Sequence, residues 1–270
     1  MKKTAALMLA IVLCLSVFAG CGAQDQQNQT DLGGTQQEVK EKVVVGLDDS
    51  FPPMGFRDEK TNELIGVDID LIKAVGEKMG VEMELKPIDW KTKEMELNSK
   101  KIDIIWNGYT ITDERKEQVA FSHPYMDNAQ IIVVSKDSDI KAKADLAGKK
   151  VGVQGGSSGQ DAVEADAAYA SIGEENLRKY DTIPMALMDL EAGRVDAVVA
   201  DEVVVNYYLA KMQKDHVILS DNFGTEEYGI GFRKDDTELL NKVEDAFKAL
   251  MEDGTMEKIS NEWFGKMMIK

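Results

Sequence analysis

The chain has 270 residues, of which 43% are hydrophobic, and it carries a formal net charge of −17 at pH 7. This acidity excludes nucleic-acid binding, which needs a basic surface, and an anionic lipid surface would repel the chain as well. Both cysteines, Cys14 and Cys21, lie near the N-terminus, which excludes a disulfide scaffold and a cysteine nucleophile in the folded part.

The first segment of the chain predicts export. "MKK" and the apolar stretch "TAALMLAIVLCLSVF" have the charged start and apolar core of a secretory signal peptide over residues 1–20. This stretch is shorter than the ~20 residues that a membrane-spanning helix needs. The small residues of "FAGC" resemble a bacterial lipobox and predict lipidation of Cys21, although Phe18 stands where leucine is usual. The alternative is a plain secreted protein with an incidental cysteine.

The polar segment that follows Cys21 predicts a tether. Residues 22–41 are rich in glutamine and glycine and hold few apolar side chains, so they cannot bury enough surface to fold. We therefore expect residues 21–41 to be the lipidated cysteine and a flexible linker. The remaining chain is long enough for two small domains.

Beyond the tether, apolar periodicity predicts strands that alternate with helices. One helix is expected over residues 67–80, because Ile69, Ile72, Val75 and Met79 recur at helical spacing before Gly80. The other expected elements of this half are strands over 43–47, 81–88 and 102–106 and a short helix over 93–100.

The C-terminal part repeats the helical pattern. Within "TELLNKVEDAFKALMEDG", Leu240, Val243, Phe247, Leu250 and Met251 fall on one expected helix face before Gly254. The alternation of strands and helices predicts α/β architecture with largely parallel sheets.

A weak internal sequence repeat, called the internal echo below, suggests two similar α/β units. "LNSKKIDIIWNG" (97–108) aligns with "LEAGRVDAVVAD" (190–201), and "KVVVGLDDS" resembles "KKVGVQGGSS". The echo places Gly108 and Asp201 at equivalent positions just past equivalent strands. Ligands of open α/β sheets bind at such strand ends.

The stretch "NGYTITDER" (107–115) allows two interpretations. It can be a helix start, with Thr112 as the cap and two acidic residues at the positive end of the dipole. It can also hold a carboxylate, because an arginine makes bidentate, charge-assisted hydrogen bonds to that group. If the two units face each other, Arg115 and Asp201 would meet the two charged ends of an α-amino acid. Because buried charges need partners, we expect the ligand to supply the partner of each.

Several ordered motifs carry a family resemblance over residues 42–270. They are "VVVGLDDSFPPMGF", "LIGVDIDLIKAVGEKMG", "IDIIWNGYTITDER", "FSHPYM", "LAGKKVGVQGGSSG", "GRVDAVVAD", "EYGIGFRK" and "DGTMEKISNEWFG". In this order and spacing the chain resembles the bacterial extracellular solute-binding proteins of family 3, the substrate-binding lipoproteins of polar amino-acid ABC importers. The resemblance implies a two-lobed periplasmic-binding-protein-like fold of the class II type, with α/β lobes joined by two crossover hinge strands. It places lobe 1 at 42–129 plus 228–270 and lobe 2 at 130–227, and it implies closure around the ligand.

The resemblance also implies roles for residues at the matching positions. Arg115 would grip the ligand's α-carboxylate, with Gly108 allowing close approach and Thr110 adding a hydroxyl. Asp201 would accept the α-ammonium, and it can also cap the helix that follows it. Phe51 and Trp90 would form aromatic walls around the ligand side chain; the alternative for both is ordinary core.

Four further residues complete the expected site. Asn107 stands at the pocket floor, where relatives carry a smaller residue. Asp48 would contact the far end of the ligand side chain, and Gln154 and Ser158 match contact positions of lobe 2. "QGGSSG" (154–159) opens a helix but lacks the lysine of a nucleotide-binding loop.

These features predict a binding protein that captures a polar L-amino acid by hinge closure and delivers it to a membrane permease. Asp48 and the uncharged Gln154 favour arginine, lysine or glutamine over glutamate. The alternative is an enzyme on the same fold, similar to a cyclohexadienyl or arogenate dehydratase. We expect no cofactor and no metal, since His123 and His216 lack companion ligands. We expect a monomer that is lipid-anchored to the cell membrane on its extracellular or periplasmic face.

Overall fold

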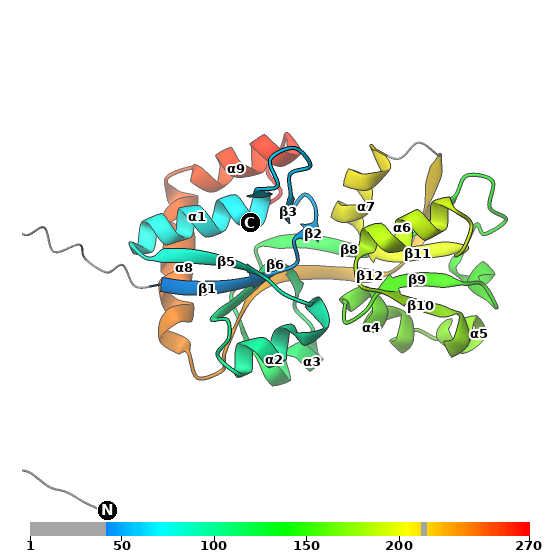
Figure 1. Cartoon of the computed structure of the whole chain (residues 1–270), viewed down its shortest axis with the longest axis horizontal. Coiled ribbons are helices and arrows are strands. Elements are labelled where there is room, and N and C mark those ends of the chain that lie inside the picture. The colour runs from blue at the N-terminus through cyan, green and yellow to red at the C-terminus, as the bar shows by residue number, and fades with distance from the viewer. Residues whose placement is uncertain (1–41, 212–214) are drawn as a thin grey trace, which may run out of the picture. The chain divides into compact units, whose positions relative to one another are not determined.

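The computed structural model describes residues 42–211 and 215–270 (Figure 1). The predicted signal peptide, the lipidation of Cys21 and the tether lie outside the described residues. None of the helices in the described residues has the length and apolar character of a membrane-spanning segment.

Nine strands of the described chain form one mixed sheet in the order β10-β9-β11-β8-β12-β6-β1-β5, with β7 beside β12. Their bounds are β1 (Lys42–Leu47), β5 (Glu82–Pro87), β6 (Ile104–Thr110), β7 (Ala120–Phe121), β8 (Met126–Ser135), β9 (Val151–Gln154), β10 (Leu177–Tyr180), β11 (Ala197–Asp201) and β12 (His216–Phe232). A second, small sheet is antiparallel and contains β2 (Ser50–Phe51), β3 (Gly55–Arg57) and β4 (Leu64–Ile65).

Helices cover both faces of the large sheet at each of its ends. Figure 1 shows α1 and α9 on one side of the β1–β5–β6 strands and α2 and α3 on the other. At the opposite end, α6 and α7 lie on one side of β9 and β11, and α4 and α5 on the other. The helices are α1 (Val67–Met79), α2 (Lys93–Asn98), α3 (Asp113–Gln118), α4 (Ser158–Ala165), α5 (Tyr169–Ile172), α6 (Ile183–Glu191), α7 (Glu202–Leu209), α8 (Thr237–Glu252) and α9 (Thr255–Phe264), with 3-10 turns η1 (Trp90–Thr92), η2 (Lys143–Leu146) and η3 (Glu174–Asn176).

This arrangement is the predicted two-lobed fold. We call β1–β7 with α1–α3, α8 and α9 lobe 1, and β9–β11 with α4–α7 lobe 2. Strands β8 and β12 pair with each other and extend from one lobe into the other. The predicted boundaries, 129/130 and 227/228, fall inside these two strands; the boundaries themselves stay a prediction.

The predicted helices form where the apolar spacing indicates. In α1, Ile69, Ile72 and Val75 are buried, and Gly80 ends the helix in the left-handed region at φ 72°. The prediction for Met251 in α8 is wrong, because its side chain is exposed. It lies about 100° around the helix from buried Leu250 and so falls off the apolar stripe.

The expectation of largely parallel sheets holds only toward the two ends of the sheet. The β1–β5, β1–β6, β9–β10 and β9–β11 pairs are parallel. The pairs that involve β8 and β12 are antiparallel, including the β8–β12 pair itself. The sequence did not show this central part, because long strands that link two lobes form through contacts between distant segments.

The internal echo corresponds to equivalent local structure. Both halves of the echo contain a helix end, a tight turn and a strand, which is β6 in lobe 1 and β11 in lobe 2. Asp103 accepts a hydrogen bond from the backbone N–H of Val44 at 3.0 Å, and Asp196 accepts one from the N–H of Lys150 at 2.8 Å. Two aspartates at aligned positions therefore join the same pair of strands in each lobe, which supports the duplication.

Candidate functional site

Arg115 lies at the start of α3, just past the end of β6. Thr112 caps this helix, because its hydroxyl accepts a hydrogen bond from the N–H of Arg115 at 3.1 Å. The helix-start interpretation of "NGYTITDER" is thus confirmed. It does not exclude the other, because the Arg115 side chain turns back from the helix and is only 5% exposed as a residue.

The Arg115 guanidinium bridges the two lobes. It donates to the carbonyl oxygen of Thr110 at 2.9 Å and to that of Gly156, in lobe 2, at 3.3 Å. Its carbon lies 4.8 Å from the centre of the Tyr109 ring. Since a guanidinium has five N–H donors and two hydrogen bonds are formed here, donors remain to hold a carboxylate.

Gly108 shapes the wall of lobe 1 beside this arginine. Its φ of 55° lies in the left-handed region, and a Cβ atom here would come within 2.6 Å of the Phe51 ring. Its N–H donates at 2.8 Å to the carboxyl of Asp68, which also accepts a hydrogen bond from the Tyr125 hydroxyl at 3.0 Å. Sequence reasoning missed Asp68, because an acidic residue in a first helical turn is typical of any helix start.

Asp68 should make the stability of the protein depend on pH. Burial raises its pKa from 3.8 to about 7. Between these values the folded protein holds a proton that the unfolded chain has lost, so this contribution to stability is full below pH 3.8 and is lost as the pH rises through 7. We expect Asp68→Asn to remove a slope of up to about 1.4 kcal/mol per pH unit in that range. Urea unfolding over a pH series measures it.

The fully exposed Asp113 provides the control. Asp113→Asn should keep the wild-type slope, since it leaves the buried carboxyl of Asp68 in place. Equal slopes for Asp68→Asn and wild type would show that Asp68 is not protonated in the folded protein.

Asp201 ends β11 and is buried in lobe 2. One of its carboxyl oxygens accepts hydrogen bonds from the Asn128 amide and from the Tyr228 hydroxyl, each at 2.7 Å. Its side chain makes no capping bond to α7, so the interpretation of Asp201 as a side-chain cap is wrong. Burial first, and then the negative charge of Glu226, raise the pKa of Asp201 to about 8.

Asp48 and Gln154 meet across the lobes. Asp48 lies four residues after Val44, and Gln154 lies four residues after the equivalent Lys150. The two side chains therefore hold corresponding positions at the ends of β1 and β9. The Gln154 amide donates to the Asp48 carboxylate at 2.7 Å. Both side chains are buried, and burial raises the pKa of Asp48. The structure thus brings together two of the predicted side-chain contacts.

Thr110 and Ser158 form a second contact between the lobes. The Ser158 hydroxyl lies 3.0 Å from the Thr110 hydroxyl, and both side chains are buried. Both hydroxyls also contact the carboxylate of Glu226, on β12. Glu226 was missed by sequence reasoning, because a charged residue in the polar run "SDNFGTEE" gives no signal of burial.

The two predicted aromatic walls lie in different surroundings. Phe51 packs against Gly108, as described above, whereas Trp90 packs edge-on against Tyr109 at 5.8 Å between ring centres. Both rings are buried. Asn107, the predicted floor residue, donates to the carbonyl oxygen of Asp48 at 2.5 Å and so ties the residue after β1 to the middle of β6.

Lys93 is a buried cation that sequence reasoning also missed. Its ammonium donates to the carbonyl oxygen of Gly156 at 2.9 Å and lies 5.1 Å from the centre of the Trp90 ring. Burial and the nearby charge of Arg115 lower its pKa to about 8. A lysine in the first turn of a helix is unfavourable, because its charge opposes the helix dipole. This unusual position was the feature of the sequence that could have pointed to Lys93.

The glycines of "QGGSSG" allow the lobes to approach each other. A Cβ at Gly156 would lie 3.0 Å from Cα of Lys91, and one at Gly155 would lie 2.6 Å from the Lys91 side chain. The serine that follows, Ser157, caps α4 by accepting a hydrogen bond from Gln160 N–H at 3.1 Å. The motif therefore starts helix α4 and lets the two lobes come into close contact. Lys91 also forms an ion pair with Asp181 across the lobes.

These contacts correct the expectation that a ligand must supply the partners of the two buried charges. Arg115 has carbonyl partners, and Asp201 has an amide and a hydroxyl. Groups of the protein therefore satisfy each charge in part, and the carboxylates of Glu94 and Asp161 also lie 4.0 Å from the Arg115 guanidinium. The bond from Arg115 to Gly156 joins the lobes directly.

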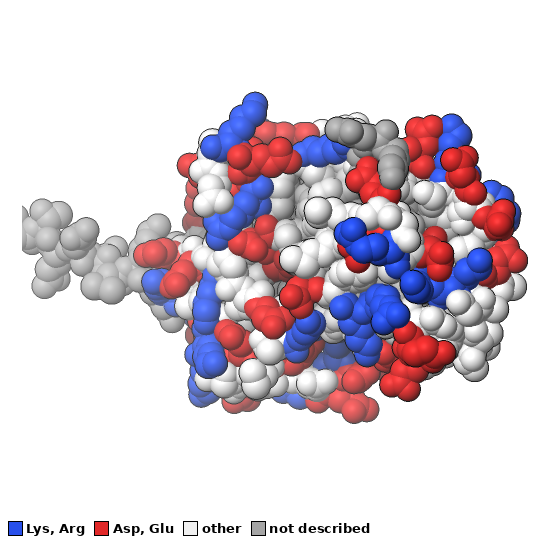
Figure 2. All heavy atoms as spheres, turned by 45° about the vertical axis from the view of Figure 1, so that its right-hand side comes forward, with Lys and Arg blue, Asp and Glu red and all other residues white. Residues whose placement is uncertain are grey.

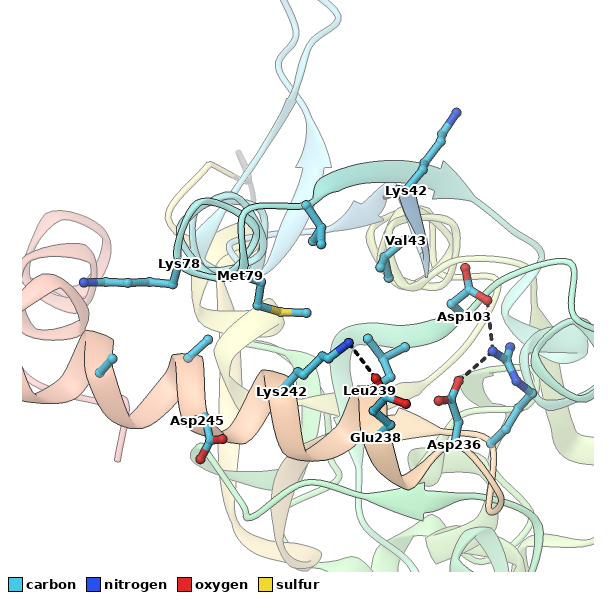
Figure 3. A pocket seen from close by; sticks show the side chains of 14 residues that line it. Lys42, Val43, Lys78, Met79, Asp103, Asp236, Glu238, Leu239, Lys242 and Asp245 are labelled. Carbon is cyan, nitrogen blue, oxygen red and sulfur yellow. Dashed lines mark hydrogen bonds and ion pairs between the residues drawn. The ribbon is translucent and has the colours of Figure 1, made fainter. Parts of the chain in front are cut away.

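A separate cavity of about 620 Å³ lies on the outer side of lobe 1, between β1, α1 and α8 (Figure 3). None of the predicted binding residues lines it. Its charges are largely paired: Asp103 and Asp236 both bind Arg233, and Lys242 binds Glu238. We therefore place the candidate site between the lobes and not in this cavity.

The charges of the described surface are mixed. On the face in Figure 2, basic side chains are interspersed with acidic ones. Four ion pairs of lobe 2 are Lys136–Asp215, Lys143–Asp166, Lys179–Glu164 and Arg194–Asp189. Among the described residues, no group of three or more acidic, histidine or cysteine side chains is placed to hold a metal ion.

Comparisons with known proteins agree on one family. The family described as "Bacterial extracellular solute-binding proteins, family 3" matches residues 43–266. The L-cystine-binding protein TcyJ of Escherichia coli (strain K12) is 31% identical over 263 residues, which are 96% of this chain and 95% of that protein. ABC transporter arginine-binding protein 1 of the same strain is 34% identical over 229 residues, 83% of this chain and 91% of that protein.

A solved structure shares the fold. It is that of a substrate-binding protein of an ABC uptake transporter from Streptococcus pneumoniae, with bound histidine. Its TM-score is 0.81 at 41% sequence identity, and the match covers 85% of this chain and 94% of that one.

Proposed function

This chain belongs to family 3 of the bacterial extracellular solute-binding proteins, and we propose that it captures a polar L-amino acid between its lobes for an ABC importer. The similar proteins named above bind cystine, arginine and histidine, which supports an amino acid as the solute. The permease of the importer is the membrane partner in this proposal.

One observation carries the proposal: a buried guanidinium and a buried carboxylate lie on opposite lobes and are joined by a chain of hydrogen bonds. The chain runs from Arg115 through Thr110, Glu226 and Asn128 to Asp201. A free α-amino acid carries the complementary groups, a carboxylate for Arg115 and an ammonium for Asp201. Binding of both ends would add new charged contacts to the direct contacts between the lobes.

The far end of the site supports a ligand side chain that donates hydrogen bonds. Asp48 offers a buried carboxylate, and the amide oxygen of Gln154 is buried without a hydrogen-bond partner among the described residues. Arginine, lysine and glutamine carry suitable donors. A glutamate side chain would place a second negative charge beside Asp48, at a cost in affinity.

A thermal-shift screen against the twenty amino acids tests this function. A ligand that binds only the folded state stabilises it by ~2.7 kcal/mol at a hundredfold excess over Kd. We expect one or a few polar L-amino acids to raise the melting temperature, and mass spectrometry to recover them unchanged. No response to any amino acid would contradict the proposal, and a dehydrated product from a cyclic precursor would support the enzyme alternative.

Cys21 is proposed as the lipid anchor of the domain on the outer face of the cell membrane. Cys21→Ser should release the protein into the medium or periplasm, since the chain is strongly acidic, with a net charge of −17 over its 270 residues, and has little attraction to anionic lipid. Fractionation followed by immunoblotting measures the release, and titration calorimetry should give an unchanged Kd for the amino acid. A mutant that stays in the membrane fraction as wild type does would disprove the anchor.

A further inference from the structure

The carboxylate of Glu226, on β12, binds groups of both lobes. Among the described residues, no other acidic side chain of this strand does so. Glu226 lies in a polar stretch of the strand, and its neighbour Glu227 faces the other way. Glu227 is exposed and pairs with Lys270 at 2.6 Å. The two consecutive glutamates therefore differ in environment although the sequence presents them alike.

Four side chains converge on one oxygen of the Glu226 carboxylate. Asn128 donates to Oε1 at 2.6 Å, Gln130 at 2.8 Å and Thr110 at 2.9 Å, and the Ser158 hydroxyl lies at 3.3 Å. Thr110 belongs to lobe 1 and Ser158 to lobe 2, while the two amides belong to β8. Together these groups form a receptor for a carboxylate oxygen at the meeting point of the lobes.

The hydrogens of these donors are almost fully engaged, by Glu226 and by its neighbours. The Asn128 amide has two, of which one serves Asp201 at 2.7 Å and the other serves Glu226. The Ser158 hydroxyl has one, shared between Thr110 at 3.0 Å and Glu226 at 3.3 Å. A second carboxylate could therefore not use the same donors while Glu226 holds them.

We propose that Glu226 is an internal competitor for the carboxylate of the bound amino acid, holding Thr110 and Ser158 until the ligand displaces it. This inference deepens the proposed function and rests on it, because the same two hydroxyls are predicted ligand contacts. Glu226 then sets the affinity of the site: the protein binds its amino acid less tightly than the donors alone would allow.

The neighbouring charge supports displacement. Glu226 and Asp201 share the amide of Asn128, so two carboxylates lie close together, and the negative charge of Glu226 adds to burial in raising the pKa of Asp201. An incoming amino acid brings its own ammonium with its carboxylate. Exchange of the Glu226 carboxylate for a zwitterion therefore relieves the repulsion on Asp201. Glu226 is itself only half-buried, which leaves its side chain a path to solvent.

The test compares Glu226→Ala and Glu226→Gln with the matched control Glu227→Ala, using calorimetry with the best amino acid of the screen. We expect Glu226→Ala to lower Kd about tenfold, which corresponds to ~1.4 kcal/mol. Glu226→Gln should fall between it and wild type, because a neutral amide binds the donors less strongly, and Glu227→Ala should match wild type. A higher Kd for Glu226→Ala would mean that Glu226 binds the ammonium, and an unchanged Kd would also overturn the proposal.

A second measurement does not need an amino-acid ligand. Propionate has the carboxylate of a glutamate side chain, so it should occupy the donors that Glu226→Ala leaves free. We expect sodium propionate, compared with sodium chloride at equal ionic strength, to raise the melting temperature of Glu226→Ala but not that of wild type. If no amino acid binds any variant, the proposed function fails while this result still decides the role of Glu226. Equal responses of the two proteins would overturn it.

Discussion

Arg115→Ala should abolish most amino-acid binding. Removal of one partner from a buried, hydrogen-bonded charge contact typically costs ~2–5 kcal/mol, a loss of roughly thirtyfold to several thousandfold in affinity. An exposed ion pair contributes at most ~1 kcal/mol, so the size of the effect separates a binding role from a surface role. The mutation also removes the bond from the guanidinium to Gly156, which joins the lobes. Titration calorimetry with the preferred amino acid measures the loss.

Thr112→Ala is the matched control on the same helix. It removes the cap of α3 and should lower the free energy of unfolding by ~1 kcal/mol while the Kd stays near that of wild type. A near-wild-type Kd for Arg115→Ala would mean that "NGYTITDER" is only a helix start, and the assignment of a carboxylate clamp would fall.

Asp201→Asn should weaken binding nearly as much and also remove its pH dependence. The carboxyl of Asp201 must be ionised to attract an ammonium, and its pKa is raised to about 8. Below that pH, binding has to displace a proton, so wild-type affinity should rise with pH up to about 8, by as much as tenfold per pH unit. The asparagine can still accept hydrogen bonds from Asn128 and Tyr228 but carries no charge. Calorimetry over a pH series gives both quantities.

Asp49→Asn is the control for this substitution. Asp49 lies beside a predicted contact residue but pairs with Arg57 at 2.6 Å on the surface. Its removal should change neither the affinity nor the pH profile. If Asp201→Asn kept the wild-type rise of affinity with pH, another group would be the ammonium acceptor.

The local elements could be predicted because their causes are local. Apolar spacing and Gly80 defined α1, and a small polar side chain at Thr112 defined the start of α3. The 17-residue strand β12 could not be predicted in this way. Its segment 220–227 is polar and is held in the sheet by pairing with β8, a contact between segments far apart in the chain.

Motif positions along the chain identify the main polar and charged groups of the candidate site. Arg115, Asp201, Asp48 and Gln154 were all expected from motif position, and all four are buried in the structure. These residues lie at or just beyond the carboxyl ends of strands. Such strand ends lie along one edge of an α/β sheet, where ligands bind. Their roles as ligand contacts remain a proposal that the mutants above address.

What surrounds those groups depends on how distant segments of the chain pack together. Asp68 lies in the first turn of a helix and Glu226 in a polar run, and nothing local distinguishes them from solvated residues such as Glu227, whereas Lys93 at a helix start gave a local signal. They are drawn into the site because strands and helices from different parts of the chain exclude water around them. Burial shifts the pKa values of Asp68 and Lys93, the nearby Arg115 adds to the shift of Lys93, and both causes are properties of the packed protein that cannot be read from the order of residues.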